Sequence, residues 1–366
     1  MFSSPTTSIR RKNVLVITCI SEMKMRWTIA GLRFLVGYAH FAIRGGLLSN
    51  VNMFPEPQFV DSNDIRMAVY EQGEGPAVIM VHGFPELAFS WRHQLPALAA
   101  AGFRAIAPDM RGYGKTDAPS GVDQYCMAKL IGDLHGLLDA LELERATFIG
   151  HDWGALILWH MAMLAPQRID KLITLNIPHY PRSPVDPIAV MRERFGSDFY
   201  IVNFQDSDEA ENAFAADPAH FFDMMMRKNQ ILREQFDQLP PQMKVLSLLK
   251  VMQRSQSGGA PLLTDDERDY YVNAFTKSGF TNPVNWYRNW TRNWEALEGV
   301  NQLVNIPTLF IGAVDDVIIA PEHIEAMRPL VTNLTIEMLE PCGHWTQQER
   351  PDDVNHLIIS WLNRFT

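Results

Sequence analysis

The motif Gly-His-Asp-Trp-Gly at residues 150–154 contains the side chain best placed to act as a nucleophile. It follows an apolar run, residues 146–150, and precedes a helix-like stretch, residues 155–165. A strand, a tight turn and a helix in that order form a nucleophile elbow, in which glycines let the backbone bend sharply below the central side chain. Such elbows normally carry serine, whereas this one carries Asp152. Taken alone, the motif is equally compatible with a turn in which Asp152 caps the following helix.

A carboxylate at this position changes the kind of bond that the site can process. Serine attacks an acyl carbon and forms an ester, which water later hydrolyses. With a saturated carbon, serine would form an ether that a triad base does not cleave. Asp152 would instead form an alkyl ester whose carbonyl belongs to the protein, and an activated water can hydrolyse that ester. The aspartate therefore predicts substrates with an electrophilic saturated carbon, such as epoxides or alkyl halides.

Two companion residues follow in the chain order nucleophile, acid, histidine. An apolar strand-like run at residues 306–313 leads into Asp315 and Asp316, and polar groups just past a strand end lie where ligands collect in α/β sheets. His344 follows the next strand-like run, residues 334–339. We predict that His344 activates water and that Asp316 orients it, with Asp315 as the alternative acid.

An upstream motif supplies hydrogen-bond donors for the ester. The apolar run at residues 77–81 ends in His-Gly-Phe-Pro at residues 82–85. In such folds, the loop after this strand provides one N–H group of the oxyanion hole, and the residue after the nucleophile provides the other. These are the backbone N–H groups of Phe84 and Trp153, and one such donor lowers a barrier by about 2.7–4 kcal/mol. The Phe84 side chain is also expected to line the substrate cavity.

Together these motifs resemble the epoxide hydrolases of the α/β-hydrolase fold, above all the C-terminal catalytic domain of vertebrate soluble epoxide hydrolase and its bacterial and plant relatives. The resemblance extends from about residue 58 to the C-terminus. The motifs that carry it are His-Gly-Phe-Pro-Glu at 82–86, Asp-Met-Arg-Gly-Tyr-Gly at 109–114, Gly-His-Asp-Trp-Gly-Ala at 150–155 and Gly-His-Trp-Thr-Gln at 343–347.

The resemblance implies a helical cap inserted after the sixth strand, with two tyrosines above the nucleophile. Residues 199–205 and 285–290 are similar to the two family segments that carry them, which assigns Tyr200 and Tyr287. The chemistry requires such groups, because ring opening leaves an alkoxide and a tyrosine with a pKa of about 10 stays protonated to receive it. The expected substrate-binding residues are Phe84, Trp153, Tyr200, Tyr287 and Trp345.

Two alternative functions remain open at this point. Haloalkane dehalogenases share the Asp-Trp pair, but usually carry Asn where this chain has Phe84; fluoroacetate dehalogenases carry Arg where it has Trp153. A departing halide also needs no acid, so a tyrosine pair favours epoxides. The second alternative is a ligand receptor that keeps the fold without turnover, as some plant hormone receptors do. The complete triad gives no support to lost chemistry.

The coarse pattern predicts an α/β-hydrolase fold, with a mainly parallel central sheet, helices on both faces and an inserted helical cap. The strand pattern stops between residues 179 and 304. The expected domains are a basic extension (1–52), the first part of the core (53–178), the cap (179–304) and the second part of the core (305–366). Strands are expected at residues 65–71, 77–81, 104–108, 146–150, 171–176, 307–312 and 333–338.

Charge is distributed unevenly along the 366 residues. Residues 1–52 carry seven Lys or Arg and one Glu, a net charge of +6, whereas the whole chain carries −10. The acidic remainder argues against nucleic-acid binding. The extension is a leader, a membrane-surface helix over residues 27–43, or non-native sequence upstream of Met53. Arg33 and His40 interrupt its apolar stretches, so no stable membrane insertion is expected.

The remaining composition predicts an enzyme without a disulfide framework, a metal or a cofactor. The three cysteines, Cys19, Cys126 and Cys342, have no paired spacing that would suggest a disulfide framework. No zinc-like cluster or nucleotide-binding loop is recognisable, so we expect no metal and no cofactor. We expect a cytoplasmic monomer or homodimer whose partner is a small epoxide.

Overall fold

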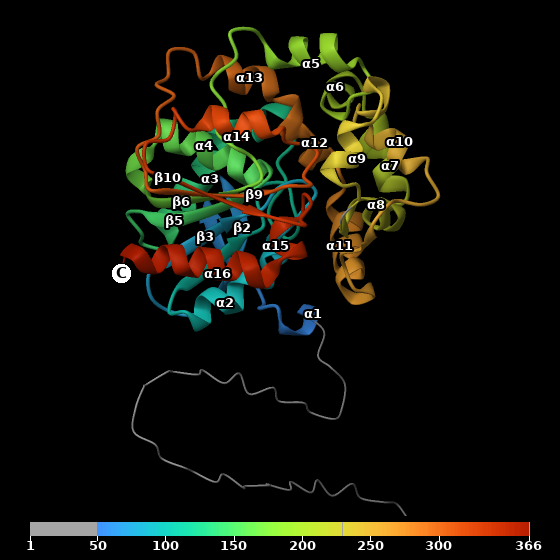
Figure 1. Ribbon diagram of the computed structural model, residues 1–366. Helices are drawn as coiled ribbons and strands as arrows, with labels where there is room; N and C mark the ends of the chain where they lie inside the picture. The colour runs from blue at the N-terminus through green and yellow to red at the C-terminus, as the bar shows by residue number, and fades with distance from the viewer. Residues whose placement is uncertain (1–49, 229, 366) are drawn as a thin grey trace, which may run out of the picture. The chain divides into compact units, whose positions relative to one another are not determined.

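A mostly parallel sheet forms the centre of the core (Figure 1). The computed structural model describes residues 50–228 and 230–365, and the fold is reported for these residues. The β2 strand runs antiparallel to both neighbours, and the other neighbouring pairs are parallel. Across the sheet the order is β1 (Gln58–Ser62), β2 (Ile65–Gln72), β4 (Arg104–Pro108), β3 (Ala77–Val81), β5 (Ala146–His151), β6 (Ile169–Leu175), β9 (Thr308–Ala313) and β10 (Leu334–Leu339).

The expected fold class is confirmed, and each strand expected from the sequence is present, with ends that differ by up to two residues. The β1 strand was not expected. It lies at the sheet edge, its first residues are exposed, and Phe59 is 40% exposed. A short edge strand that buries little apolar surface has no clear alternation of apolar and polar residues, so the sequence pattern did not reveal it.

Helices cover both faces of the sheet (Figure 1). The α2 (Gln94–Ala100) and α16 (Pro351–Leu362) helices pack on one face, and α3 (Met127–Ala140) and α4 (Trp153–Leu164) pack on the other. Every residue of β5 is buried, as expected for a central strand that is covered on both sides. Two separate apolar clusters, one on each face, therefore hold the sheet rigidly in place.

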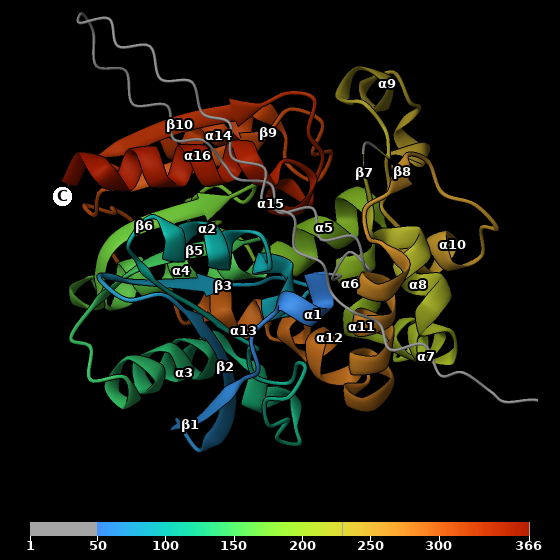
Figure 2. The ribbon, with the colours of Figure 1, turned by 90° about the horizontal axis from the view of Figure 1, so that it is seen from below.

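A helical cap lies between β6 and β9 in the chain and beside the core in space (Figures 1 and 2). It lies where the sequence analysis expected an insertion, although the domain limits remain predictions. The helices of the cap are α5 (Pro187–Phe195), α6 (Tyr200–Asp206), α7 (Glu209–Ala216), α8 (Pro218–Met225), α9 (Arg233–Asp237), α10 (Leu248–Met252), α11 (Asp265–Ser278), α12 (Thr281–Arg288) and α13 (Trp290–Glu295).

The cap also contains a short antiparallel pair, β7 (Arg227–Lys228) and β8 (Ala260–Pro261), where no strands were expected. Two residues are too few to produce a periodic pattern. The other short helices are α1 (Asn50–Met53), α14 (Pro321–Met327) and α15 (Thr346–Glu349). Single 3₁₀ turns occur at Ala88–Trp91, Val122–Tyr125, Pro166–Arg168, Pro241–Met243 and Asn363–Phe365.

Most of the predicted basic extension, residues 1–49, lies outside the described residues. The described end of this region contacts the cap, because the Asn50 side chain donates a hydrogen bond to Glu267 Oε1 at 2.7 Å. Phe54 packs against Phe89 of the core and Tyr270 of the cap. In the described part of the chain, no helix has both the length and the apolar character needed to cross a bilayer.

Candidate active site

The predicted site residues of the core lie at one edge of the sheet. The β3, β5, β6, β9 and β10 strands are consecutive neighbours and parallel, so their carboxyl ends meet at that edge. Phe84, Asp152, Asp316 and His344 each follow the end of one of these strands within five residues. Parallel strand ends thus bring together residues that are up to 260 positions apart in the chain.

The backbone at Asp152 is bent as a nucleophile elbow requires. Asp152 has φ 51° and ψ −120°, an uncommon conformation for a residue with a side chain. A Cβ atom on Gly150 would lie 2.6 Å from the backbone nitrogen of Ala155, and one on Gly83 would lie 2.5 Å from the Cβ of Asp152. The two glycines therefore permit the turn itself and the close approach of the neighbouring loop.

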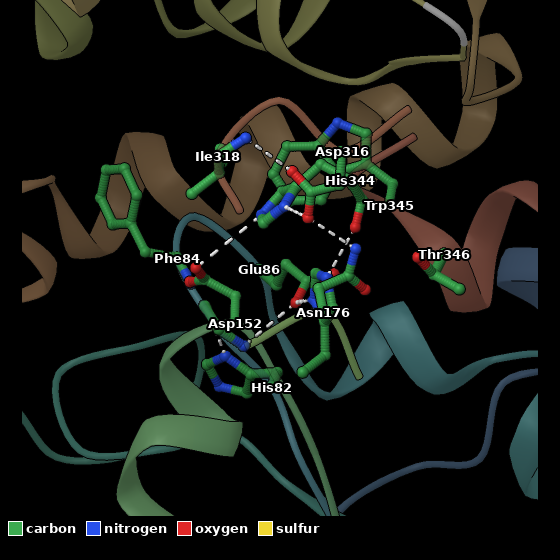
Figure 3. Close-up of polar contacts among 12 residues, drawn as sticks. His82, Phe84, Glu86, Asp152, Asn176, Asp316, Ile318, His344, Trp345 and Thr346 are labelled. Carbon is green, nitrogen blue, oxygen red and sulfur yellow. Dashed lines mark hydrogen bonds and ion pairs between the residues drawn. The ribbon is translucent and has the colours of Figure 1, made fainter. Parts of the chain in front are cut away.

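The three predicted triad residues contact one another (Figure 3). His344 Nδ1 lies 3.0 Å from Asp316 Oδ2, and His344 Nε2 lies 3.8 Å from Asp152 Oδ2. Asp316 is buried and accepts further hydrogen bonds from Asn176 Nδ2 at 2.7 Å and from the Ile318 N–H at 3.0 Å. The imidazole can therefore present Nε2 toward the nucleophile while Asp316 holds Nδ1.

The structure also distinguishes the two candidate acids. Asp315 Oδ1 accepts a hydrogen bond from the backbone N–H of Arg233 at 2.9 Å, whereas Asp316 bonds to His344. Asp316, the preferred acid of the sequence analysis, is therefore the one that faces the imidazole.

The two predicted oxyanion donors hold the resting carboxylate of Asp152. The Phe84 N–H donates to Asp152 Oδ1 at 2.9 Å, and the Trp153 N–H donates to the same carboxylate. Burial raises the pKa of Asp152 overall, while His344 and these two donors act in the opposite direction. Once Asp152 is esterified, the same donors would face its carbonyl oxygen.

Within the triad, the charged forms of His344 and Asp316 stabilise each other. Burial alone lowers the pKa of His344, but the carboxylates of Asp316 and Asp152 outweigh it and raise that pKa to about 9. Burial also opposes ionisation of Asp316, yet His344 and the hydrogen bonds from Asn176 and Ile318 hold the pKa of Asp316 below its usual value. The resting site thus favours an imidazolium between two carboxylates.

The two predicted cap tyrosines face this triad from α6 and α12. The Tyr200 and Tyr287 rings are 5.7 Å apart, and their hydroxyl groups share a hydrogen bond. Tyr287 also accepts a hydrogen bond from the Trp153 side chain and packs its ring 5.3 Å from Phe84. Burial, together with the charge of Asp152, raises the pKa of both tyrosines, so both stay protonated at neutral pH.

Sequence reasoning missed two residues that join the tyrosine-bearing helices. Gln205 Nε2 of α6 donates to the backbone carbonyl oxygen of Tyr287 at 2.9 Å. Arg288 pairs with Glu211 at 2.7 Å and donates to the Phe204 carbonyl at 3.0 Å. Gln205 and Arg288 both belong to the segments that resemble the tyrosine-bearing segments of the family. The sequence therefore contained a signal for them, but neither residue was assigned a role.

A buried contact between Glu86 and His151, behind the triad, was also missed. Glu86 Oε2 lies 2.7 Å from His151 Nδ1, and His151 Nε2 lies 2.8 Å from the backbone oxygen of His344. Both ring nitrogens of His151 therefore face hydrogen-bond acceptors, the Glu86 carboxylate and the His344 carbonyl. Burial opposes ionisation of Glu86, but His151 keeps its pKa low. The pair anchors the backbone of His344.

Trp345, predicted to bind substrate, makes a contact between core and cap. Its indole Nε1 donates to the backbone carbonyl of Met225 in α8 at 2.9 Å, and its ring lies 4.8 Å from that of His344. The side chain is buried. Its contact with substrate remains a prediction.

The described residues contain no group of three or more His, Cys, Asp or Glu side chains arranged to hold a metal ion. Cys126 and Cys342 are free thiols, and Cys342 is fully buried. Burial raises the pKa of Cys342 to about 12, so it is not a thiolate at neutral pH.

Comparison with known proteins agrees with this geometry. The model of the α/β-hydrolase fold family matches residues 76–351. Epoxide hydrolase A of Mycobacterium tuberculosis is 38% identical over 84% of this chain and 97% of its own length. Bifunctional epoxide hydrolase 2 of Rattus norvegicus is 36% identical over 81% of this chain, which spans only 53% of that protein.

A solved structure gives the same result. The crystal structure of epoxide hydrolase A from Mycobacterium thermoresistibile superposes with a TM-score of 0.77 at 36% identity, covering 84% of this chain and 98% of the other. The chain belongs to the α/β-hydrolase fold family and, within it, to the epoxide hydrolases.

Proposed function

We propose that this protein hydrolyses epoxides to vicinal diols through an ester on Asp152. The observation that carries the proposal is a carboxylate at the elbow, held by two backbone N–H groups and opposed by two protonated tyrosines. Ring opening needs a nucleophile that attacks the epoxide carbon and an acid that protonates the epoxide oxygen. The carboxylate can be the nucleophile, and the pair of phenols can be the acid. The similarity to bacterial and mammalian epoxide hydrolases supports the same activity.

In the first step, Tyr200 and Tyr287 donate hydrogen bonds to the epoxide oxygen while Asp152 attacks the less hindered carbon. One C–O bond forms to the carboxylate, the ring C–O bond breaks, and one tyrosine gives its proton to the released alkoxide. The side chains of Phe84 and Trp153 flank Tyr287 and would contact the substrate. The product of this step is a hydroxyalkyl ester of Asp152.

In the second step, His344 removes a proton from water, and the resulting hydroxide adds to the ester carbonyl. The N–H groups of Phe84 and Trp153 stabilise the oxyanion that forms. Collapse breaks the ester C–O bond, and the leaving alkoxide takes the second proton of the water. This releases the diol and restores the carboxylate, which now contains one oxygen from water. The resting imidazolium of His344 gives its proton to the tyrosinate before His344 acts as a base. The proton that His344 then takes from water restores the imidazolium, so the cycle closes with water as the only co-substrate.

The electrostatics of the site favour this order of events. The negative charge of Asp152 is one of the groups that raise the pKa of His344 to about 9. Esterification removes that charge, so the pKa of His344 falls at the moment when His344 must act as a base. The imidazole thus becomes a more available base only after the ester has formed.

The alternative functions are less well supported by the same contacts. A haloalkane dehalogenase would use the Trp153 indole to hold a halide, but here that side chain donates to Tyr287. Phe84 offers no side-chain donor to replace it. A silent receptor has no need of a histidine placed 3.8 Å from the nucleophile.

The test is to trap the ester. We expect the His344→Gln variant, mixed with styrene oxide, to gain the mass of the substrate on the peptide that contains Asp152. The Asp152→Ala variant should gain none. An unmodified His344→Gln protein would contradict the two-step scheme. Parallel assays with an epoxy fatty acid, a bromoalkane and a nitrophenyl ester would separate epoxide hydrolysis from dehalogenation, ester hydrolysis and silent binding.

The finer predictions of the sequence analysis belong to the same proposal. We propose a small-molecule epoxide as the only partner needed for turnover, and a monomeric or homodimeric enzyme in the cytoplasm. Gel filtration with light scattering measures the oligomeric state, and cell fractionation tests the location in the cytoplasm.

A further inference from the structure

Arg233, the first residue of α9 in the cap, contacts the turn that carries Asp316. Its backbone N–H donates to Asp315 Oδ1 at 2.9 Å, and its guanidinium donates to the backbone carbonyls of Asp316 and Ile319. The Arg233 side chain is only 15% exposed. A single cap residue thus makes three polar contacts with the core turn at residues 315–319.

Within the core, this turn is held by the Ile318 N–H, which donates to Asp316 Oδ1 at 3.0 Å, by the Asp315 N–H, which donates to the Cys342 carbonyl at 2.9 Å, and by two longer bonds. The Ile319 N–H reaches the Asp316 carbonyl at a long 3.3 Å, and the Asp316 N–H reaches the Ala313 carbonyl at the same distance. Charge-assisted hydrogen bonds from a guanidinium are stronger than bonds between neutral groups, and here one terminal nitrogen, Nη2, donates to both carbonyls. The cap therefore adds charged donors to the bonds that the turn makes within the core.

The neighbouring part of the cap also touches the loop that carries His344. The Trp345 indole, one residue after His344, donates to the Met225 carbonyl at the end of α8. Met225 of the cap thus contacts the loop that carries His344, and Arg233 of the cap contacts the turn that carries Asp316. These two core segments are joined by the hydrogen bond between His344 and Asp316. In contrast, the elbow aspartate is held by N–H groups of the core.

We propose that Arg233 is a positioning residue for the His344–Asp316 pair, and that it makes the geometry of this pair depend on the docking of the cap. The backbone N–H of Arg233 also donates a hydrogen bond to Asp315, so that Asp315 points to the cap and Asp316 faces the imidazole. This inference rests on the proposed two-step reaction. It concerns the second step, because only ester hydrolysis uses His344 as a base.

The test is to measure the two steps separately in the full-length enzyme. Quenched-flow mixing of excess enzyme with styrene oxide, followed by mass spectrometry, gives the rates at which the ester on Asp152 forms and decays. In Arg233→Ala, we expect decay to slow by roughly ten- to a hundredfold, since a misplacement of about 1 Å costs about that much. Ester formation should change less than about threefold, so the ester accumulates. Arg233→Lys should restore part of the decay rate.

Arg227 provides a matched control in the same part of the cap. Its guanidinium also donates to backbone carbonyls, at 2.7 Å to both Gly258 and Gly259, but these lie within the cap. Arg227→Ala should leave both rates close to those of the parent enzyme. Thermal unfolding of both variants measures any general loss of stability.

The outcomes separate the two proposals. If the parent enzyme forms no ester, the proposed function fails and this inference fails with it. If the parent forms the ester but Arg233→Ala hydrolyses it as fast as Arg227→Ala does, the role of Arg233 alone is wrong. Equal slowing of formation and decay would also contradict it, because a generally disturbed cap affects both steps. Selective slowing of decay in Arg233→Ala, partly reversed by lysine, supports it.

Discussion

The core and the cap position their functional side chains in different ways. In the core, Asp152 and its two donors follow the ends of β3 and β5, which are neighbours in the sheet, and glycines permit the bend. In the cap, Tyr200 and Tyr287 lie 87 residues apart and are brought together by side chains such as Gln205 that bond to a neighbouring helix. The nucleophile is thus placed by local backbone geometry, and the acids by packing between helices.

This difference implies different sensitivities. A strand end in a sheet buried on both faces is rigid, so changes at the elbow should alter chemistry more than placement. Helices of five to eight residues, such as α6 and α12, depend on tertiary contacts for their stability, so distant changes in the cap should alter placement. Four predictions test this contrast, from the largest expected effect to the smallest.

The largest effect is expected from Asp152→Gly. Turnover should fall on the order of 10⁴-fold or more, because no other side chain can form the ester. Stability should not fall, since glycine relieves a strained backbone conformation that costs of order 1–3 kcal/mol. Urea unfolding and a diol assay measure the two quantities. Residual ester formation would show that the nucleophile lies elsewhere, and a marked loss of stability would show that the carboxylate holds the elbow together.

The second prediction concerns the acids. Tyr200→Phe and Tyr287→Phe should each slow ester formation by about ten- to a hundredfold, and the double variant by about 10²–10⁴-fold. Ester decay should change little, because water attacks from the side of His344. Single-turnover rates provide the measurement. A double variant that opens epoxides at the parent rate would remove the tyrosines from the mechanism.

The third prediction tests whether the cap places its acids through side chains. Gln205→Leu keeps the size of the side chain but removes the donor to the Tyr287 carbonyl. Ester formation should slow by about tenfold, as expected if the Tyr287 hydroxyl shifts by a fraction of an ångström. Gln242→Leu, at an exposed position of the cap, is the control and should have no effect. If both variants behave alike, the two helices do not need this bond.

The smallest effect is a shift in pKa. His344 has a pKa of about 9 in the resting enzyme, and it is an active base only when neutral, so ester hydrolysis should speed up as the pH rises. Because esterification removes the charge of Asp152, which helps to raise the pKa of His344, the hydrolysis rate should level off at a pH below about 9. Decay of the pre-formed ester, followed between pH 6 and about 10, supplies the profile. A midpoint at or above 9 would mean that Asp152 does not set the basicity of His344.

Local patterns revealed more of the core than of the cap. The glycines at the elbow and the apolar runs before Phe84, Asp152 and His344 predicted strand ends, and their places in the structure agree. The edge strand β1 was missed because it buries little apolar surface. The family pattern and its distance past the strand favoured Asp316 over Asp315 in the sequence. The contacts of this turn with Arg233, more than 80 residues earlier in the chain, had no local signal.

The sequence by itself determined the strand ends and the tight turn at which the predicted nucleophile, triad and oxyanion donors lie, because these features are specified by neighbouring residues. Only the tertiary structure decided which residues anchor the backbone of His344 and which cap residues reach the catalytic turn. Those features depend on contacts between distant segments, and such contacts leave no periodicity or spacing that a single sequence reveals.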